Sequence, residues 1–223
     1  MYADGLDLSK YDTDKINHHY LDLYGPQLAQ WRDKPVQLLE LGILKGGSLR
    51  LWRDYFPQGN ITGIDLHLPK DFAATDRINI FQGSQTDVAF LSNTANKVAP
   101  EGFDIIIDDA SHMGIETKTS FWHLFDKHLK PGGLYVIEDW GTGYWGDWPD
   151  GKSMDFADYE VSPRPKTPFP NHSYGMVGFI KQLVDEQAAG DATRQNLKGT
   201  PTRSSRFRSL LIMPSVVFVT KHY

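Results

Sequence analysis

The stretch Phe103-Asp104-Ile105-Ile106-Ile107-Asp108-Asp109-Ala110-Ser111-His112 decides the fold. A short apolar run bounded by polar residues is typical of a strand buried in a parallel sheet. The pattern recurs at Gly133-Leu134-Tyr135-Val136-Ile137-Glu138-Asp139-Trp140. Like charges repel and resist burial, so two such strands that both end in paired acids indicate a cation bound at that end.

Strands and helical segments alternate along the chain, which predicts an α/β fold with helices on both faces of the sheet. We expect a doubly wound, mostly parallel seven-stranded sheet with a terminal antiparallel strand. The expected strands are residues 36–41, 60–65, 78–82, 103–108, 134–137, 209–213 and 215–220. The expected helices are residues 48–55, 89–98, 116–129 and 174–189, and the Lys130-Pro131-Gly132-Gly133 run should end the third of them.

Composition narrows the function. The 223 residues carry a net charge of −5 and no cysteine, which excludes disulfides and thiolate chemistry and fits a cytoplasmic enzyme. No apolar run approaches the roughly 20 residues of a transmembrane helix, and no signal sequence is apparent. The negative charge argues against a nucleic-acid partner. A basic cluster at Arg203, Arg206 and Arg208 is expected to be solvated.

The chain is expected to form one domain, residues 1–223, with two special segments. Residues 1–33 should lie over the site. Residues 141–173 are rich in Gly, Pro, Asp and aromatics and show no periodicity, which is typical of a functional lid; a disordered surface insertion is the alternative. The aromatic residues Trp140, Tyr144, Trp145 and Trp148 either line an acceptor site or pack the loop.

Ligands of an open parallel sheet bind at the carboxyl ends of its strands. Because residues 103–108 and 134–137 should form neighbouring strands, their terminal acids should converge. Carboxylate oxygens favour a hard cation, here Mg²⁺, with Mn²⁺ or Ca²⁺ as alternatives. The expected ligands are Asp109, Glu138 and Asp139. Asp108 and Asp109 should point to opposite sides, so one of them contacts the ion.

Two histidines are candidates for catalysis. His112 follows the acids closely, and an imidazole accepts a proton near neutral pH, so we assign it as general base. The bland alternative is a helix-capping or solvent-exposed histidine. His172, at the end of the lid, is the second candidate, because it would reach an acceptor when the lid closes.

The loop after the first strand contains Glu40, Gly42, Gly46 and Ser48. It fails the dinucleotide and P-loop patterns, but it resembles the E-x-G-x-x-x-G-G/S loop of class I S-adenosylmethionine (SAM) methyltransferases. Asp65 ends the second strand, where an acid accepts hydrogen bonds from ribose hydroxyls. The segment from Gln85 to Asp87 follows the third strand, where this fold holds adenine. An ordinary strand-to-helix turn is the alternative.

Together these segments resemble the metal-dependent class I O-methyltransferases that modify sugar hydroxyls, including macrolide deoxysugar and mycobacterial sugar enzymes. They are also similar to the cephalosporin hydroxylase family, which shares the SAM-binding fold. The resemblance rests on Asp12-Thr13-Asp14-Lys15, His18-His19-Tyr20, the Glu40–Ser48 loop, Ile107-Asp108-Asp109-Ala110-Ser111-His112 and Val136-Ile137-Glu138-Asp139.

The resemblance implies methyl transfer from SAM, with Mg²⁺, to a hydroxyl of a sugar or a glycosylated small molecule. It matches Asp109, Glu138 and Asp139 to the family's metal ligands and His112 to its base, and it places the Thr13–Lys15 segment over the cofactor and acceptor. The residues assigned to the cofactor are Thr13, Lys15, Glu40, Gly42, Lys45, Gly46, Ser48, Asp65, Gln85, Asp87 and Asp108.

Three other functions are open at this point. A catechol-type O-methyltransferase would use the same metal logic on an aromatic diol, and a non-catalytic protein would only bind SAM. A metal-dependent hydroxylase would need a redox site, usually of two histidines and a carboxylate. A homodimer is a further expectation, with the N-terminal segment and residues 209–220 as candidate contacts.

Overall fold

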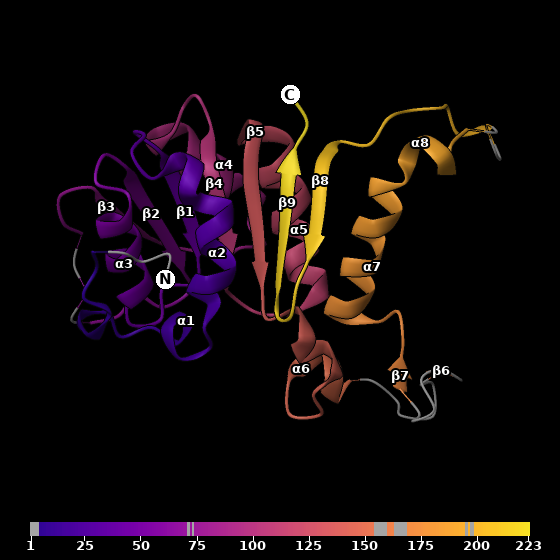
Figure 1. Ribbon diagram of the computed structural model, residues 1–223, viewed down its shortest axis with the longest axis horizontal. Coiled ribbons are helices and arrows are strands. Elements are labelled where there is room, and N and C mark those ends of the chain that lie inside the picture. Colours follow the sequence, from indigo (N-terminus) through magenta and orange to yellow (C-terminus); the bar gives the residue numbers. More distant parts are fainter. Residues whose placement is uncertain are drawn as a thin grey trace.

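The computed structural model describes residues 5–70, 72, 74–153, 160–162, 169–194, 196 and 199–223. Its centre is a seven-stranded sheet in the order β3-β2-β1-β4-β5-β9-β8 (Figure 1). The first five strands in the chain are parallel, and β9 runs antiparallel between β5 and β8. This confirms the expected doubly wound α/β sheet. The strands are β1 (Gln37–Leu41), β2 (Asn60–Asp65), β3 (Ile78–Gln82), β4 (Phe103–Asp108), β5 (Leu129–Glu138), β8 (Phe207–Ile212) and β9 (Val216–Lys221).

Two apolar cores lie on the two faces of the sheet, because neighbouring residues of a strand point to opposite sides. Leu38 packs in one core and Leu39 in the other. The first core is covered by the N-terminal helices α1 (Asp14–Asn17) and α2 (Tyr20–Leu28) and by α3 (Gly47–Tyr55). The second is covered by α4 (Val88–Val98), α5 (Gly114–Lys127) and α7 (Gly175–Gln187).

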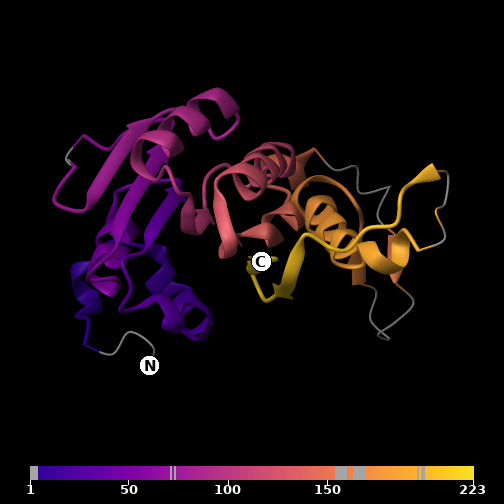
Figure 2. The ribbon, with the colours of Figure 1, turned by 90° about the horizontal axis from the view of Figure 1, so that it is seen from above.

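Seen from above, the N-terminal part lies at one end of the molecule and the orange and gold segment at the other, and the chain returns to end near the middle (Figure 2). Short helical pieces complete the described chain: η1 (Leu8–Lys10), η2 (Ala29–Trp31) and α8 (Ala189–Ala192). None of the helices among the described residues is long and apolar enough to cross a bilayer.

One strand differs from its expected bounds. We expected the Lys130-Pro131-Gly132-Gly133 run to separate α5 from a strand at residues 134–137, but β5 already begins at Leu129. Pairing with β4 shifts register there, from Phe103↔Leu129 to Ile105↔Leu134. The breaker residues therefore bulge out of a longer strand, and Gly132 takes the positive φ of +74° that the bulge needs.

The segment 141–173, expected without regular structure, contains several short elements. They are η3 (Trp140–Tyr144), α6 (Pro149–Lys152) and an antiparallel pair of β6 (Glu160–Ser162) with β7 (Phe169–Asn171). Residues 154–159 and 163–168 of this segment, like residues 1–4 of the N-terminal one, lie outside the described residues. Of this segment, η3 and α6 pack against α7 and are therefore not an irregular loop.

An ion-pair network fixes the end of α7. Glu186 is buried and accepts from both terminal nitrogens of Arg203, at 2.7 and 2.6 Å, and from the Nε of Arg206 at 3.3 Å. Burial alone would raise the pKa of Glu186, but the two guanidinium groups outweigh it and lower that pKa to about 2. Arg203 and Arg206, expected to be simply solvated, are half exposed and bind this carboxylate.

Glu186→Gln should therefore flatten the acid side of the stability curve. Because the folded-state pKa lies below the ordinary 4.5, the carboxylate stabilises the fold above pH 4.5, and that stability is lost as pH falls toward 2. Urea denaturation over this pH range should show a steeper loss for the wild type than for Glu186→Gln. The exposed Glu101→Gln variant is the control, and parallel curves for wild type and Glu186→Gln would refute the assignment.

Candidate active site

The strand ends line up at one edge of the sheet. Leu41 at the end of β1 pairs with both Ile64 of β2 and Asp108 of β4, and Asp108 pairs with Ile137 of β5. The next residues, Gly42, Asp109 and Glu138, therefore lie at neighbouring strand ends, as the sequence predicted. A pocket of about 730 Å³ opens at this edge. Its walls come from the N-terminal segment, the glycine loop, the ends of β2 and β3, the loop after β4, and the first part of the lid.

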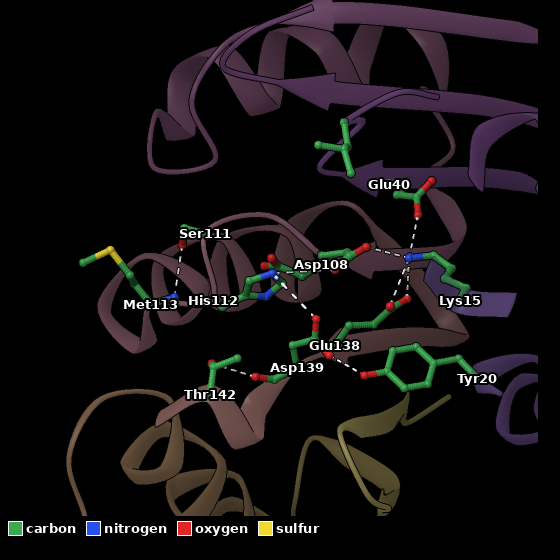
Figure 3. A network of polar contacts seen from close by, with 12 residues as sticks. Lys15, Tyr20, Glu40, Asp108, Ser111, His112, Met113, Glu138, Asp139 and Thr142 are labelled. Atoms are coloured by element: carbon green, nitrogen blue, oxygen red, sulfur yellow. Dashed lines mark hydrogen bonds and ion pairs between the residues drawn. The ribbon is translucent and has the colours of Figure 1, made fainter. Parts of the chain in front are cut away.

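Lys15 ties three of these strand ends together. Its ammonium is fully buried and lies 3.3 Å from Oε1 of Glu40, 2.6 Å from Oδ2 of Asp109, and 2.9 and 3.0 Å from the two oxygens of Glu138. Figure 3 shows Lys15 pointing toward Glu40 and Glu138 from the N-terminal segment. The carboxylates come from β1, from the residue after β4 and from β5, which are neighbours in the sheet.

The cluster has more negative than positive charge. Burial opposes the charged form of Lys15, but Asp109, Glu138 and Glu40 outweigh it and raise its pKa well above the usual range. Burial also raises the pKa of Glu138 well above its usual value; the charge of Asp109 adds to this, and Lys15 only partly offsets it. Burial likewise raises the pKa of Asp109. One ammonium does not compensate these acids, so a further cation would be stabilised here.

Two tyrosines of α2 donate hydrogen bonds to the acids at the end of β5. The hydroxyl of Tyr24 donates to Glu138, and the hydroxyl of Tyr20 donates to Asp139. Burial is the main cause that raises the pKa of each phenol, so both stay protonated donors. Neither tyrosine was predicted from the sequence to act in the site. Their i, i+4 spacing, which places both on one face of a helix, was the available signal.

Asp109, His112 and Asp139 form the group that could hold a metal. Each offers one ligand atom, and these atoms lie within 4.8 Å of one another. His112 Nε2 is 3.9 Å from Asp109 Oδ1 and 3.8 Å from Asp139 Oδ2. Figure 3 shows the imidazole directed toward Asp139. His112 and Asp139 adopt φ values of +52° and +54°, which are costly for residues with a side chain and are concentrated at functional sites.

Asp108 points to the other face of β4, as the alternation of the strand predicted. It is buried and accepts from Ser120 Oγ at 2.6 Å, Tyr135 Oη at 3.2 Å and Gln85 Nε2 at 3.3 Å. Burial raises its pKa to about 6. Asp108 does not line the pocket, whereas Gln85 does. Asp108 is therefore linked to the pocket through Gln85. The side-chain oxygen of Gln85 also accepts from the backbone N–H of Ser111.

The glycine loop is held by two acids. Asp65 Oδ2 accepts from the backbone N–H groups of Ile43 at 2.7 Å and Leu44 at 3.2 Å, so it fixes the loop and still lines the pocket. Glu40 lies behind the loop and accepts from Ser48 Oγ at 2.8 Å. Gly42, at φ +95°, permits the loop to approach the strand-four end: an added Cβ would lie 2.0 Å from the carbonyl oxygen of Asp109.

The structure brings some of the expected site residues to the pocket and places others elsewhere. Thr13, Gly42, Lys45, Ser48, Asp65, Gln85, Asp109, His112 and Asp139 line it, whereas Lys15, Glu40, Gly46, Asp87, Asp108, Glu138 and His172 do not. Lys15, Glu40 and Glu138 form the buried layer beneath it. Gly46 packs on Phe72, and Asp87 caps α4 through Phe90 N. His172 is buried against Tyr144 and is not brought together with His112.

The donor set fits a hard divalent cation. Two carboxylates with a neighbouring imidazole provide oxygen ligands for Mg²⁺, and the uncompensated acid charge of the cluster favours such an ion. The second part of the pocket, between the glycine loop, Asp65 and Gln85, has the place and the polar groups that a nucleoside needs at the switch point of a doubly wound sheet.

The strand order, the antiparallel strand next to the edge and the pocket at the carboxyl ends define a class I methyltransferase fold. No protein-family model matches the chain. Its homologues are sugar O-methyltransferases. Mycinamicin VI 2''-O-methyltransferase of Micromonospora griseorubida is 41% identical over 96% of this chain and 51% of the relative. A tetracenomycin-C 3'-O-methyltransferase of Streptomyces olivaceus is 46% identical over 61% of this chain and 36% of the relative.

A solved structure of a relative has the same fold. The MycE methyltransferase from the mycinamycin biosynthetic pathway, in complex with Mg and SAH, superposes with a TM-score of 0.76 at 33% identity. The match covers 99% of this chain and 55% of MycE. The chain thus spans about half the length of the relatives it matches. It is a homologue of these sugar O-methyltransferases and has the class I methyltransferase fold.

Proposed function

We propose that the protein is a SAM-dependent O-methyltransferase that transfers a methyl group to a sugar hydroxyl of a glycosylated small molecule, with a divalent metal. The observation that carries the proposal is the convergence of Asp109, Asp139 and His112 on one wall of the pocket, with their ligand atoms within 4.8 Å of one another. The other part of the same pocket has the polar groups that would bind a nucleoside. The names of the relatives, which act on glycosylated macrolides and polyketides, support the acceptor class.

The residues divide into four roles. Asp109 and Asp139, with Glu138 beside them, would hold Mg²⁺, and Thr13, Gly42, Ser48, Asp65 and Gln85 would hold SAM. When bound, SAM supplies the methyl group and Mg²⁺ lowers the pKa of the acceptor hydroxyl. His112 accepts the hydroxyl proton on Nε2 as the oxygen becomes the nucleophile. Trp145 and Trp148 line the open side of the same pocket, where flat rings pack on the apolar faces of a sugar.

The described residues do not provide the metal ligands that a hydroxylase would need. Among the described residues, the one group suited to a metal contains a single histidine and two carboxylates, whereas a non-haem iron hydroxylase typically uses two histidines and one carboxylate. A catechol-type O-methyltransferase would share the metal and the base, so only the acceptor distinguishes it from a sugar O-methyltransferase.

Calorimetric titration with SAM, followed by an acceptor panel, tests the proposal. We expect SAM to bind the EDTA-treated protein and the Mg²⁺-loaded protein alike, because the nucleoside half of the pocket is built from other residues. Methyl transfer should occur only with Mg²⁺ and only on glycosides. Transfer to catechols but not to glycosides would identify the other acceptor class, and the absence of SAM binding in both states would overturn the proposal.

The remaining expectations about partners also stay proposals. We infer a small-molecule partner rather than nucleic acid or a membrane from the net charge of −5 and the pocket of about 730 Å³. A cytoplasmic location and a homodimer complete the proposal; fractionation and analytical ultracentrifugation test them.

A further inference from the structure

One carboxylate caps two helices beside the pocket. Asp150 of α6 is buried, and its Oδ2 accepts from the backbone N–H of Gly114 at 2.7 Å and from that of Met176 at 2.7 Å. Gly114 begins α5 and Met176 is in the first turn of α7. In Figure 1, α6 lies beneath the ends of both helices. An anion at the positive ends of two helix dipoles is stabilised by both.

Neither helix has a cap of its own. The residues before them, Met113 and Tyr174, make no side-chain capping bond. The first N–H groups of a helix need an acceptor when they are buried. Asp150 supplies it for both helices, from the segment 141–173 in which the sequence predicted a functional lid.

Glycines allow the junction to close. A Cβ on Gly114 would lie 2.2 Å from the carbonyl carbon of Gly175, and a Cβ on Gly175 would lie 2.3 Å from Asp150 Oδ2. A Cβ on Gly151 would lie 2.1 Å from the carbonyl oxygen of Trp145. The approach of α5, α7 and the lid at this point is thus too close for any other residue at these positions.

The two residues of a ring contact in the site, His112 and Trp148, lie close in sequence to the groups that meet at Asp150. Trp148 precedes Asp150 by two residues, and His112 precedes Gly114 by two residues. The rings of His112 and Trp148 meet edge to face, with centroids 5.1 Å apart and planes at 72°, and both residues line the pocket. His112 also holds a costly φ of +52°, which persists only where the surroundings over-determine it.

We propose that Asp150 is a positioning residue: by capping α5 and α7 together, it holds Trp148 against the imidazole of His112 and so sets the direction of the base toward the acceptor. The inference rests on the proposed function for its catalytic consequence, but the ring geometry it predicts exists without any ligand. Asp150 does not touch the reacting atoms; it acts through Trp148 and through the start of α5.

NMR of the histidine side chains in the full-length, ligand-free chain tests the geometric half. The His112 ring signals, identified by their loss in His112→Ala, should carry a ring-current shift from Trp148. Asp150→Ala and Trp148→Ala should both remove that shift. Asp104→Asn is the matched control, because Asp104 also accepts a backbone N–H, from Gln37 at 2.8 Å, but lies at the opposite end of β4. An unchanged His112 signal in Asp150→Ala overturns the proposal.

Kinetics test the catalytic half. Asp150→Ala and Trp148→Ala should each lower kcat by about ten- to hundredfold with unchanged SAM affinity, since a small misplacement of a catalytic group has effects of this size. The double variant should lose no more than the worse single variant. Asp150→Asn keeps an acceptor oxygen and should recover most of the rate. If Asp150→Ala does not fold, Asp150→Ser replaces it, because the shorter side chain does not reach both N–H groups. Multiplying losses in the double variant would overturn the coupling.

The two failures are distinguishable. If the wild-type protein methylates no acceptor but the His112 signal still depends on Asp150 and Trp148, the proposed function fails and the positioning role of Asp150 stands. If the wild-type protein is active and the signal does not respond, only the positioning role of Asp150 fails.

Discussion

Lys15→Met is expected to destabilise the metal-free protein by about 3–5 kcal/mol, the loss typical when one partner of a buried ion pair is removed. The ammonium of Lys15 contacts Glu40, Asp109 and Glu138 and is fully buried. Without it the three carboxylates lie together with no positive charge between them. The Tyr24 hydroxyl still donates to Glu138, but a neutral donor does not offset the repulsion of like charges.

Saturating Mg²⁺ should restore more stability to Lys15→Met than it adds to the wild type. The ion would meet acids that no ammonium already neutralises, and binding to the folded state alone raises stability. Denaturation in EDTA and in Mg²⁺ measures both effects. Lys130→Met is the matched control, because Lys130 pairs with Asp104 at 2.9 Å in a partly exposed position, where a loss below about 1 kcal/mol is expected. An equal loss for Lys15→Met with and without Mg²⁺ would contradict the shared-charge interpretation.

His112→Ala is expected to lower kcat by about a hundred- to ten-thousandfold, the range over which general bases contribute. SAM affinity and Mg²⁺ affinity should change little, since Asp109 and Asp139 remain. Single-turnover methyl transfer, with calorimetry for each ligand, separates the steps. The control is His123→Ala. His123 lies on α5, forms a hydrogen bond with Ser92 of α4 at 2.8 Å, and does not line the pocket.

A folded, metal-binding His112→Ala protein at the wild-type rate would exclude His112 as the base. Loss of metal binding together with activity would instead assign His112 to the metal. The distances of 3.8 and 3.9 Å from its Nε2 to the two carboxylates place the imidazole near enough for either role, so the two affinities decide between them.

The sequence predicted the sheet well because its strands are buried on both faces and end in polar residues. The alternation of Asp108 and Asp109 followed from the pleat alone, and the structure places them on opposite sides of β4. The bulge at the start of β5 was not predictable in this way, because a Pro-Gly-Gly run marks a break but does not tell whether the strand pairs before it.

The site was predicted in outline but not in its layers. Spacing brought Asp109, His112 and Asp139 together, yet it does not reveal that Lys15, almost a hundred residues before Asp109 in sequence, contacts Asp109. Asp150 acts through tertiary contacts, which leave no local pattern. The i, i+4 spacing of Tyr20 and Tyr24 places both on one face of a helix but does not tell which acids they contact. His172 was placed at the site on the assumption that the lid closes over it, whereas its ring packs on Tyr144 outside the pocket.

The most direct test of the account is the mass of a glycosylated acceptor after incubation with deuteromethyl-labelled SAM and the metal-stripped protein, with and without restored Mg²⁺. The account predicts that one labelled methyl group appears on the sugar only when Mg²⁺ is restored, and that SAH forms in equal amount. Labelling at the same rate in the presence of chelator, or SAM binding with no labelled glycoside under either condition, would contradict it.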